Sequence, residues 1–238
     1  RRPYSESSLL VDLFTREHGR IAAIAKGARR LKSRFRGALQ PFQELVVHYT
    51  GKGEVRTVTL AEPVVAQKNL SRERLLCGYY MSELVITMLH RFDPHEALYD
   101  AYNEAIQLIR SGQERQQLLR QFEKTLLEEI GYGLHLTQEP GTGRAIERGV
   151  LYRYRPGVGP ERYDGAPGDG VILRGDSLLA LNAGDDLDEE SRLELKKLTR
   201  VALSAHMNGK AIHSRLIYGK LFPAADSSDE LVESGPQV

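Results

Sequence analysis

The pattern of hydrophobic and polar positions in the first sixty residues is that of short strands. Apolar segments at residues 8–15 and 21–25 form one pair, and segments at 45–49 and 55–60 form a second. A short connection containing glycine joins the members of each pair, as in β-hairpins. Isolated strands would leave exposed edges, so we expect these strands to close into a small OB-fold β-barrel.

The spacing of apolar positions becomes helical from about residue 72. It predicts three helices, over residues 72–91, 93–110 and 114–130. Asp93 is followed by a proline and, three positions on, by a glutamate, so it is expected to be the N-cap of the second helix. Gly131 is placed to end the third helix. These three helices predict a helical second domain.

A stretch rich in glycine and proline, at about residues 131–175, interrupts the helical part. We expect an irregular insert with one strand-like segment at 150–155. If the insert folds, it must be held by the packing of a few apolar side chains: Leu151, Tyr152, Tyr154 and Val171. Two more helices are expected, near 177–181 and over 188–207, the second of them closed by Asn208 and Gly209.

The chain therefore reads as an α+β protein with three parts. Residues 1–67 are expected to form the OB-fold domain, and residues 68–222 a mainly helical domain that contains the insert. Residues 223–238 are acidic and made of small side chains, and we expect this tail to be disordered.

The cysteine content is what we expect of a protein in a reducing compartment. Cys77 is the only cysteine, so neither an intrachain disulfide nor a cysteine-based zinc cluster can form. No apolar run approaches the roughly 20 residues that cross a bilayer, and the N-terminus lacks the order of a signal peptide. We expect a cytoplasmic protein without a membrane partner.

The formal net charge of +1 conceals a strongly basic N-terminal part. Residues 1–60 contain twelve Lys and Arg but only five acids. Six of these cations fall within eleven residues and form a basic loop: Lys26, Arg29, Arg30, Lys32, Arg34 and Arg36. Such a cluster binds phosphates by displacing condensed counterions. We expect this loop, with Arg20, Lys52 and Arg56 as further candidates, to bind DNA.

Three aromatic residues lie in or near the basic loop. Tyr4, Phe35 and Phe42 could stack on unpaired bases, which favours a single strand over a duplex. The alternative is that Phe35 and Phe42 fill the core of the barrel. A basic loop could also be only a solvated segment, but its attachment to a small barrel favours nucleic-acid binding.

Several sequence blocks resemble the bacterial RecO family of recombination mediators. They occur in the family's order and spacing: Arg2-Pro3-Tyr4-Ser5-Glu6-Ser7-Ser8-Leu9, Asp12-Leu13-Phe14-Thr15, Gly19-Arg20, Ala25-Lys26-Gly27-Ala28-Arg29, Gly37-Ala38-Leu39-Gln40-Pro41-Phe42, Gly51-Lys52-Gly53-Glu54-Val55, and Phe122-Glu123 through Gly131-Tyr132-Gly133. The similarity extends to Met207-Asn208-Gly209-Lys210, and the insert and the acidic tail are the least similar parts.

This resemblance implies an OB-fold followed by a helical domain. It further implies binding of single- and double-stranded DNA, annealing of complementary strands, contacts with RecR and with single-stranded-DNA-binding protein (SSB), and loading of the RecA recombinase in the nucleoid. Some members hold zinc with four cysteines in the insert. This sequence has none there, and His135 is its only histidine in that stretch, so we expect a zinc-finger-like insert without zinc ligands.

The resemblance also assigns a peptide site in the helical domain. Arg120, with Leu119 and Phe122 beside it, matches the part of the family that binds the acidic C-terminal tail of SSB. A guanidinium can hold a carboxylate with two hydrogen bonds while apolar neighbours receive an aromatic side chain. The alternative is an ordinary surface arginine on an amphipathic helix.

We find no pattern typical of an enzyme. Residues 141–144 lack the ending of a phosphate-binding loop, and adjacent acids such as Asp185 and Asp186 diverge on or beside helices. Cys77 lies in an apolar helical stretch and is expected to be buried rather than nucleophilic. We expect no cofactor and no small-molecule substrate. The alternative to a DNA-annealing mediator is a non-annealing protein adaptor or an RNA-binding OB-fold protein.

Overall fold

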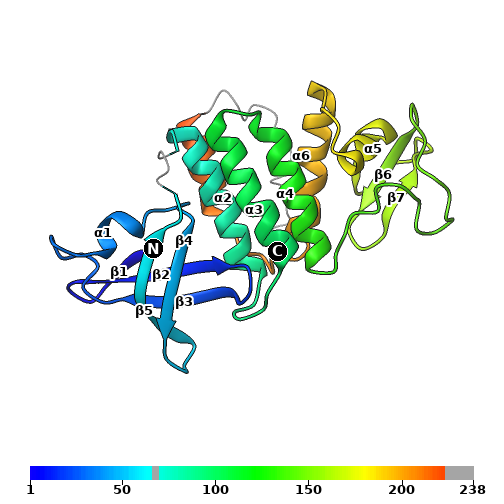
Figure 1. Cartoon of the computed structure of the whole chain (residues 1–238). Coiled ribbons are helices and arrows are strands. Elements are labelled where there is room, and N and C mark those ends of the chain that lie inside the picture. Colours follow the sequence, from blue (N-terminus) through cyan, green and yellow to red (C-terminus); the bar gives the residue numbers. More distant parts are fainter. Residues whose placement is uncertain (66–69, 223–238) are drawn as a thin grey trace, which may run out of the picture.

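The computed structural model describes residues 1–65 and 70–222. A β-sheet formed by the N-terminal part packs against a bundle of helices, and a second, smaller sheet lies at the far end of the bundle (Figure 1). The predicted α+β class is confirmed. The expected boundary between residues 67 and 68 and the acidic tail at 223–238 lie outside the described residues.

The N-terminal sheet has the predicted hairpins and one additional short strand. Its strands are β1 (Arg2–Tyr4), β2 (Ser8–Thr15), β3 (Gly19–Ala25), β4 (Leu45–Thr50) and β5 (Val55–Pro63). They lie in the order β1-β2-β3-β5-β4, with β3 and β5 parallel and the other neighbours antiparallel. β1 and β4 are therefore the edge strands in this order, and the predicted OB-type fold is confirmed in an OB-like arrangement without a β1–β4 ladder among the described residues.

Side chains that follow β3 pack on one face of this OB-like sheet. A short helix, α1 (Phe35–Ala38), packs Phe35 and Ala38 against Ala23 on β3 and Val58 on β5, in a separate apolar core. Burying an aromatic ring here removes apolar area from water, worth about 25 cal/mol per Å². The segment after β3 therefore covers part of the core of the N-terminal sheet.

Three consecutive helices form the body of the second domain, as predicted. They are α2 (Arg72–Met88), α3 (Glu96–Ser111) and α4 (Arg115–Glu129). α3 ends at Gly112, which is left-handed with φ of 106°. Their buried faces meet in the main core, around Met81, Leu98 and Leu126.

The predicted N-cap of α3 at Asp93 is wrong, because His95 occupies that position. The preceding residues are held by the sheet instead. The Phe92 amide donates to the Arg20 carbonyl at 3.1 Å. A Cβ at Gly19 would lie 2.0 Å from the Asp93 oxygen, so only glycine allows this contact.

The C-terminal helices differ from the expectation in one respect. α6 (Glu189–Ser204) is opened, as predicted, by Asp188, whose side chain accepts a hydrogen bond from the Ser191 amide. It ends before Asn208 rather than at it. A further helix, α7 (His213–Leu221), was not predicted and packs on α2.

The insert is more ordered than the sequence suggested. It contains β6 (Leu151–Arg155), β7 (Gly159–Arg162) and β8 (Val171–Arg174) in one antiparallel sheet, followed by α5 (Gly175–Ala183). Tyr152, Tyr154 and Val171 are buried as expected. Leu151 is 45% exposed, because strand alternation turns it away from Tyr152, so its expected packing role is wrong.

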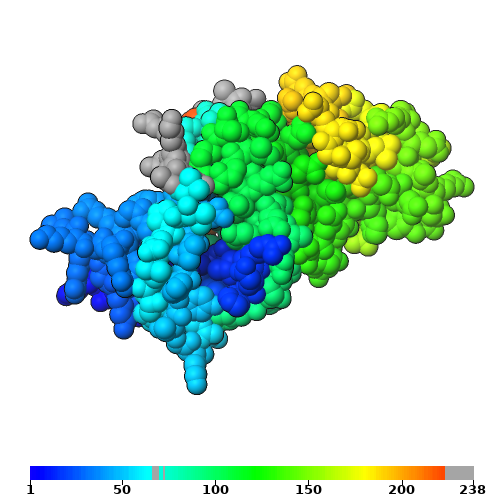
Figure 2. Space-filling view, in the orientation of Figure 1, coloured from blue at the N-terminus to red at the C-terminus, as the bar shows by residue number. Residues whose placement is uncertain are grey.

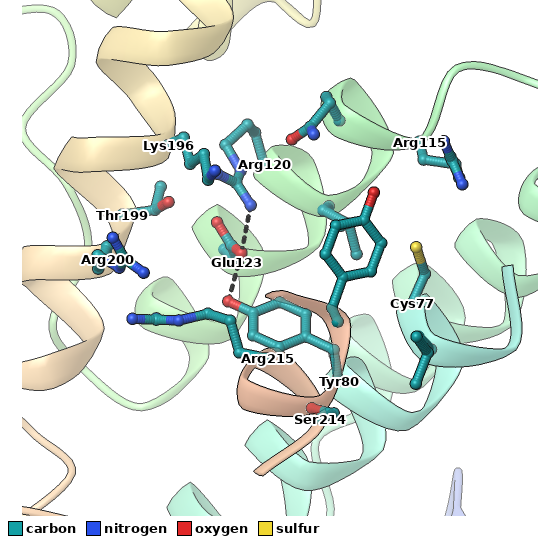
Figure 3. Close-up of a pocket in the computed structure, with 14 residues that line it drawn as sticks. Cys77, Tyr80, Arg115, Arg120, Glu123, Lys196, Thr199, Arg200, Ser214 and Arg215 are labelled. Carbon is teal, nitrogen blue, oxygen red and sulfur yellow. Dashed lines mark hydrogen bonds and ion pairs between the residues drawn. The ribbon is translucent and has the colours of Figure 1, made fainter. Parts of the chain in front are cut away.

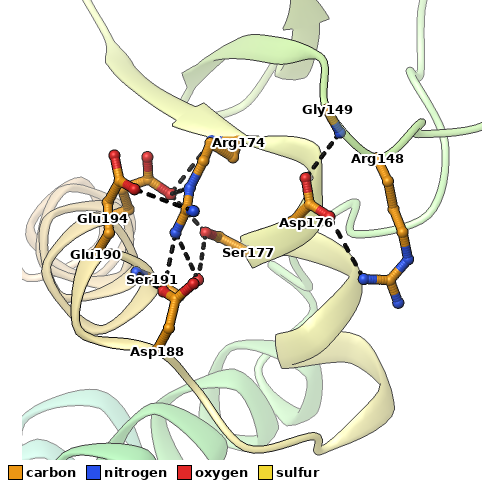
Figure 4. Close-up of polar contacts among 9 residues, drawn as sticks. All are labelled: Arg148, Gly149, Arg174, Asp176, Ser177, Asp188, Glu190, Ser191 and Glu194. Carbon is orange, nitrogen blue, oxygen red and sulfur yellow. Dashed lines mark hydrogen bonds and ion pairs between the residues drawn. The ribbon is translucent and has the colours of Figure 1, made fainter.

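Arg174 fastens the insert to the bundle (Figure 4). Its guanidinium forms ion pairs with Asp188, the N-cap of α6, and with Glu190 and Glu194 in the first two turns of that helix, at 2.9, 3.0 and 3.4 Å. Ser177 and Ser191 join the same network. Because Asp188 and Glu190 lie two residues apart at the N-terminus of α6, this arginine also shields their charges from one another.

Aromatic contacts connect the N-terminal sheet to the helices. The ring of Phe14 on β2 packs edge-on against Tyr99 and Tyr102 of α3, with centroids 5.6 and 5.8 Å apart. Tyr102 in turn meets Phe122 of α4 at 6.0 Å. Arg16 adds a hydrogen bond to Asp100 at 3.0 Å. The position of the sheet relative to the bundle is thus fixed by packing.

Candidate functional site

The basic loop, residues 26–36, projects from the sheet on the side away from the helical bundle (Figures 1 and 2). All six of its cationic side chains are exposed. None of the six forms an ion pair with a carboxylate in the described part of the chain. Their charge is therefore available to a ligand in solvent.

The backbone of the basic loop is held at both ends. The Arg29 amide donates to the Ser7 carbonyl at 2.8 Å, and the Arg34 guanidinium donates to the Thr59 carbonyl. Phe35 is 4% exposed and anchors the loop in the core. The idea that Phe35 stacks on bases is wrong, and the alternative that it fills the core is confirmed. These contacts present the cations on a defined turn.

The other two aromatic residues expected to stack on bases, Phe42 and Tyr4, differ in their exposure. Phe42 is half-buried, and its ring packs edge-on against Tyr79 of α2 at 5.1 Å. It therefore serves the contact between sheet and helices. Tyr4 on the edge strand β1 is 48% exposed and can reach a ligand.

The remaining predicted DNA-binding cations lie at the other end of β3. The basic loop follows Ala25, whereas Ala22 pairs with Val55 and so brings the β4–β5 turn toward Arg20. Lys52 is exposed in that turn. The nine predicted cations therefore form two groups rather than one surface.

Two of these cations are engaged with the helical domain. Arg20 donates to the carbonyls of Ile86 and Leu89 at the end of α2, and burial lowers the pKa of its guanidinium. The Arg56 guanidinium lies 4.7 Å from the centre of the Phe92 ring. Both side chains contribute to the junction between the domains, which sets them apart from the basic loop.

A pocket of about 110 Å³ opens between α2, α4, α6 and α7 (Figure 3). Apolar and cationic side chains share its wall. Its lining consists of Leu76, Cys77, Tyr80, Arg115, Gln116, Leu119, Arg120, Glu123, Lys196, Thr199, Arg200, Ser214, Arg215 and Tyr218. The arrangement suits a small ligand that carries both negative charge and apolar groups.

Glu83 on α2 positions the helix that closes this pocket. Its carboxylate accepts hydrogen bonds from the amides of His213 and Ser214, at 2.7 and 2.9 Å, and from the Ser214 hydroxyl at 2.7 Å. Burial opposes ionisation, but these hydrogen bonds outweigh it and lower the pKa of Glu83. A carboxylate at a helix N-terminus is favourable, so α7 is fixed beside α2.

Arg120, which the resemblance assigned to a peptide site, is not the ordinary surface arginine of the alternative interpretation. It is 5% exposed, and its Nη2 lies 2.7 Å from Oε1 of the fully buried Glu123. The Tyr80 hydroxyl donates to the same oxygen at 2.6 Å, and burial, with Glu123 nearby, raises the pKa of Tyr80 well above its usual value. Arg120 Nε and Glu123 Oε2 are buried without a hydrogen-bond partner in the described part of the chain.

The two neighbours of Arg120, which were expected to contact a peptide, lie in different environments. Leu119 lines the pocket. Phe122 is 1% exposed and packs in the core against Tyr102, so its expected contact with a peptide is wrong.

The sequence analysis missed most of the positive charge around the pocket. Arg115, Lys196, Arg200 and Arg215 line it together with Arg120. The spacing of Lys196 and Arg200, four residues apart on one helical face, was an available signal. No such signal pointed to Arg215, because α7 was not predicted.

Two other features bear on chemistry. Cys77 is buried at the pocket wall, and burial raises the pKa of its thiol, which suppresses the thiolate. No group of three or more His, Cys, Asp or Glu side chains in residues 1–65 and 70–222 is arranged to hold a metal ion. Over the same residues, no helix is long and apolar enough to cross a membrane.

Comparison with known proteins places both parts of the chain in one family. Residues 1–66 match the family described as Recombination protein O N terminal, and residues 70–216 match Recombination protein O C terminal. A protein of Azoarcus sp. strain BH72 named DNA repair protein RecO is 40% identical over 223 residues, covering 92% of this chain and 91% of that protein.

Other relatives carry the same name. The DNA repair protein RecO of Polynucleobacter asymbioticus is 42% identical, over 90% of both chains. That of Dechloromonas aromatica is 41% identical, over 92% of this chain and 91% of the relative. The resemblance drawn from the sequence blocks is confirmed, and this chain belongs to the RecO family.

Proposed function

We propose that this protein is a non-catalytic mediator of DNA repair and homologous recombination. It binds single- and double-stranded DNA, anneals complementary strands and, with RecR, helps to load RecA onto SSB-coated DNA in the nucleoid. A role in DNA repair is supported by the family and by the name that the relatives share.

The observation that carries the DNA-binding part is the exposure of all six cations of the basic loop on an OB-like sheet. Phosphate binding releases counterions from the nucleic acid, which makes affinity strongly dependent on salt. The loop extends into solvent away from the bundle, so a strand can reach it without displacing a helix (Figure 2).

Annealing follows from the same charge. Two complementary strands repel each other through their phosphates, and cations held between them reduce that repulsion. Base pairing then supplies the driving force, so no nucleotide hydrolysis is required. Lys52, at the other end of β3, offers a second contact for phosphates, whereas Arg20 and Arg56 are assigned to the junction between the domains.

The pocket is proposed to bind the acidic C-terminal tail of SSB. Its five cationic side chains attract carboxylates, and Leu76, Leu119 and Tyr218 offer an apolar wall for an aromatic side chain. Arg120 contributes to the positive wall while it is paired with Glu123, so the half-buried Lys196, Arg200 and Arg215 supply the direct contacts.

An annealing assay tests this proposal. Complementary oligonucleotides labelled with a fluorophore and a quencher are mixed with the protein, with and without SSB and without nucleotide. We expect pairing to accelerate in both conditions. Absence of acceleration would instead support the non-annealing adaptor or RNA-binding protein.

A matched control separates the basic loop from general positive charge. One variant changes Arg29, Arg30, Lys32 and Arg34 to Ala. The control removes four exposed cations from other surfaces: Arg144, Lys197, Lys210 and Lys220. Annealing should fall in the first variant and persist in the second. Equal loss in both would show that net charge, not the basic loop, is responsible.

A further inference from the structure

Leu31 lies in the middle of the basic loop and is almost fully exposed. Its side chain is 84% exposed, the highest value among the large apolar side chains of residues 1–65 and 70–222. Both of its neighbours, Arg30 and Lys32, are exposed cations. Single exposed apolar residues are common on protein surfaces. What distinguishes Leu31 is its place between two cations, on a segment that projects from the sheet into solvent (Figure 2).

A tight turn presents Leu31 to solvent. The Ser33 amide donates to the Arg30 carbonyl at 3.1 Å and closes a four-residue turn. Leu31 and Lys32 are the two central residues of that turn. The turn before it is closed in the same way, because the Arg30 amide donates to the Gly27 carbonyl at 3.1 Å. Two successive turns therefore fix the backbone that carries Leu31.

These turns are anchored on both sides. On one side, the Arg29 amide donates to the Ser7 carbonyl at 2.8 Å. On the other side, Phe35 is buried in the core, and its amide donates to the Ser33 hydroxyl at 3.3 Å. Residues 30–34 lie between these anchors. A side chain on such a short, anchored segment requires little further ordering of the backbone when it binds.

A second exposed apolar side chain lies near the base of the loop. The Arg29 guanidinium donates to the Ser5 carbonyl at 3.2 Å. Tyr4, which is 48% exposed, is the residue before Ser5. Arg29 therefore connects the segment that carries Leu31 to the strand that carries Tyr4. Exposed apolar groups and cations thus alternate in this part of the molecule.

The surroundings of Leu31 favour a polyanion that has apolar surface between its charges. The cations beside Leu31 attract phosphates. In a nucleic acid the apolar surface near the phosphates is the face of a base, and leucine is one of the side chains that proteins insert between neighbouring bases. Insertion buries the side chain but requires the bases to unstack. In a continuous duplex the cost of unstacking is similar to the gain from burial, whereas unpaired bases separate more easily.

We propose that Leu31 is a wedge that inserts between neighbouring bases and gives the basic loop a preference for unpaired DNA over continuous duplex. The proposal rests on the proposed function in treating the basic loop as a DNA-binding segment. Phosphate contacts supply affinity but do not read the bases. Leu31 supplies the selectivity that the cations of the loop lack.

The first experiment measures affinity and salt dependence together. Leu31→Asn keeps the approximate size of the side chain and every charge of the loop, but makes the side chain polar. We expect its affinity for a single-stranded oligonucleotide to fall about tenfold. Its affinity for a continuous duplex should not change. The salt slopes should also stay the same, because no cation is lost. An equal loss of affinity for both forms of DNA would overturn the proposal.

Two further variants serve as controls. Leu31→Met keeps an apolar side chain and should bind single-stranded DNA like the unmodified chain. Leu216→Asn removes a leucine that is 56% exposed on α7 and should leave both affinities unchanged. Circular dichroism checks that all variants are folded. If Leu31→Met loses as much affinity as Leu31→Asn, apolar insertion is not the cause and the proposal is overturned.

A second experiment detects the insertion directly. The oligonucleotide carries the fluorescent base 2-aminopurine, whose emission rises when the base unstacks from its neighbours. At saturating protein we expect a rise in emission with the unmodified chain and with Leu31→Met, and none with Leu31→Asn. If Leu31→Asn produces the full rise, no wedge is present and the proposal is overturned, whatever the affinity of that variant.

An anionic lipid surface is the competing ligand, because a leucine between cations also suits a membrane interface. Vesicles of equal parts phosphatidylserine and phosphatidylcholine are sedimented with the unmodified chain and with Leu31→Asn. We expect the two proteins to sediment equally. If Leu31→Asn loses vesicle binding while its DNA binding is unchanged, Leu31 contacts membranes and the proposal is overturned.

The variant with Arg29, Arg30, Lys32 and Arg34 changed to Ala separates this proposal from the proposed function. If that variant binds DNA like the unmodified chain, the basic loop is not the DNA site and the proposed function fails on this point. If that variant loses binding while Leu31→Asn keeps its affinity and its rise in emission, DNA binding by the loop stands and only the wedge is overturned.

Discussion

Arg120 and Glu123 form a buried ion pair one turn apart on α4, with 2.7 Å between Nη2 and Oε1. Tyr80 donates to the same carboxylate oxygen from α2 (Figure 3). The pair therefore links two helices of the pocket wall as well as carrying charge. Removing either partner leaves the other charge buried and uncompensated.

We predict that Arg120→Ala destabilises the protein by about 3–5 kcal/mol, because it leaves the Glu123 carboxylate buried without its ion-pair partner. Urea unfolding followed by circular dichroism measures this. The double variant Arg120→Met, Glu123→Leu should recover most of the loss, since neither charge remains. An Arg120→Ala variant with unchanged stability and reduced peptide affinity would show instead that Arg120 acts as a peptide clamp.

Changing Arg29, Arg30, Lys32 and Arg34 to Ala should weaken single-stranded DNA binding and flatten its salt dependence. Each lost phosphate contact reduces the slope of log K against log salt by about 0.7. The fold should persist, because these side chains are exposed. Titrations at several salt concentrations measure the slope. An unchanged slope would move the DNA site to the end of β3 that carries Lys52.

Arg20→Met should reduce stability while leaving the salt slope of DNA binding unchanged. The substitution removes the donor to the carbonyls of Ile86 and Leu89, at a cost of about 1–3 kcal/mol. Thermal unfolding and DNA titration are measured on the same preparation. The exposed Lys52→Met serves as the comparison and should show the reverse pattern. A reduced slope in Arg20→Met would assign this arginine to DNA.

The attachment of the insert should weaken in acid. Hydrogen bonds from the Ser191 amide and from Arg174 lower the pKa of Asp188 from 3.8 to about 2 (Figure 4). A lowered pKa means that this stabilisation is fully present above pH 3.8 and is lost as the pH falls through about 2. The difference in Tm between the unmodified chain and Asp188→Asn should therefore shrink over that interval. Asp186→Asn, at an exposed neighbour, should give no such trend.

The local structure could be predicted from the order of the amino acids alone. Four features depend only on neighbouring residues, which is why they could be predicted. They are the strand alternation in β2 to β5, the helical periodicity of α2 to α4, the glycines that end helices, and the Asp188 cap of α6. The exposure of the cations in residues 26–36 could also be predicted from the sequence, since unpaired charges are too costly to bury. The sequence blocks were also sufficient to indicate the family.

Which of these residues act together depends on contacts between distant parts of the fold. The burial of Phe35 and Phe122 and the engagement of Arg20 at the end of α2 depend on partners far away in the sequence. The pocket requires α4, α6 and α7 to meet on α2, and α7 is held there by Glu83, 130 residues before His213. No local pattern encodes such a contact, because its free energy comes from packing and hydrogen bonds between distant segments.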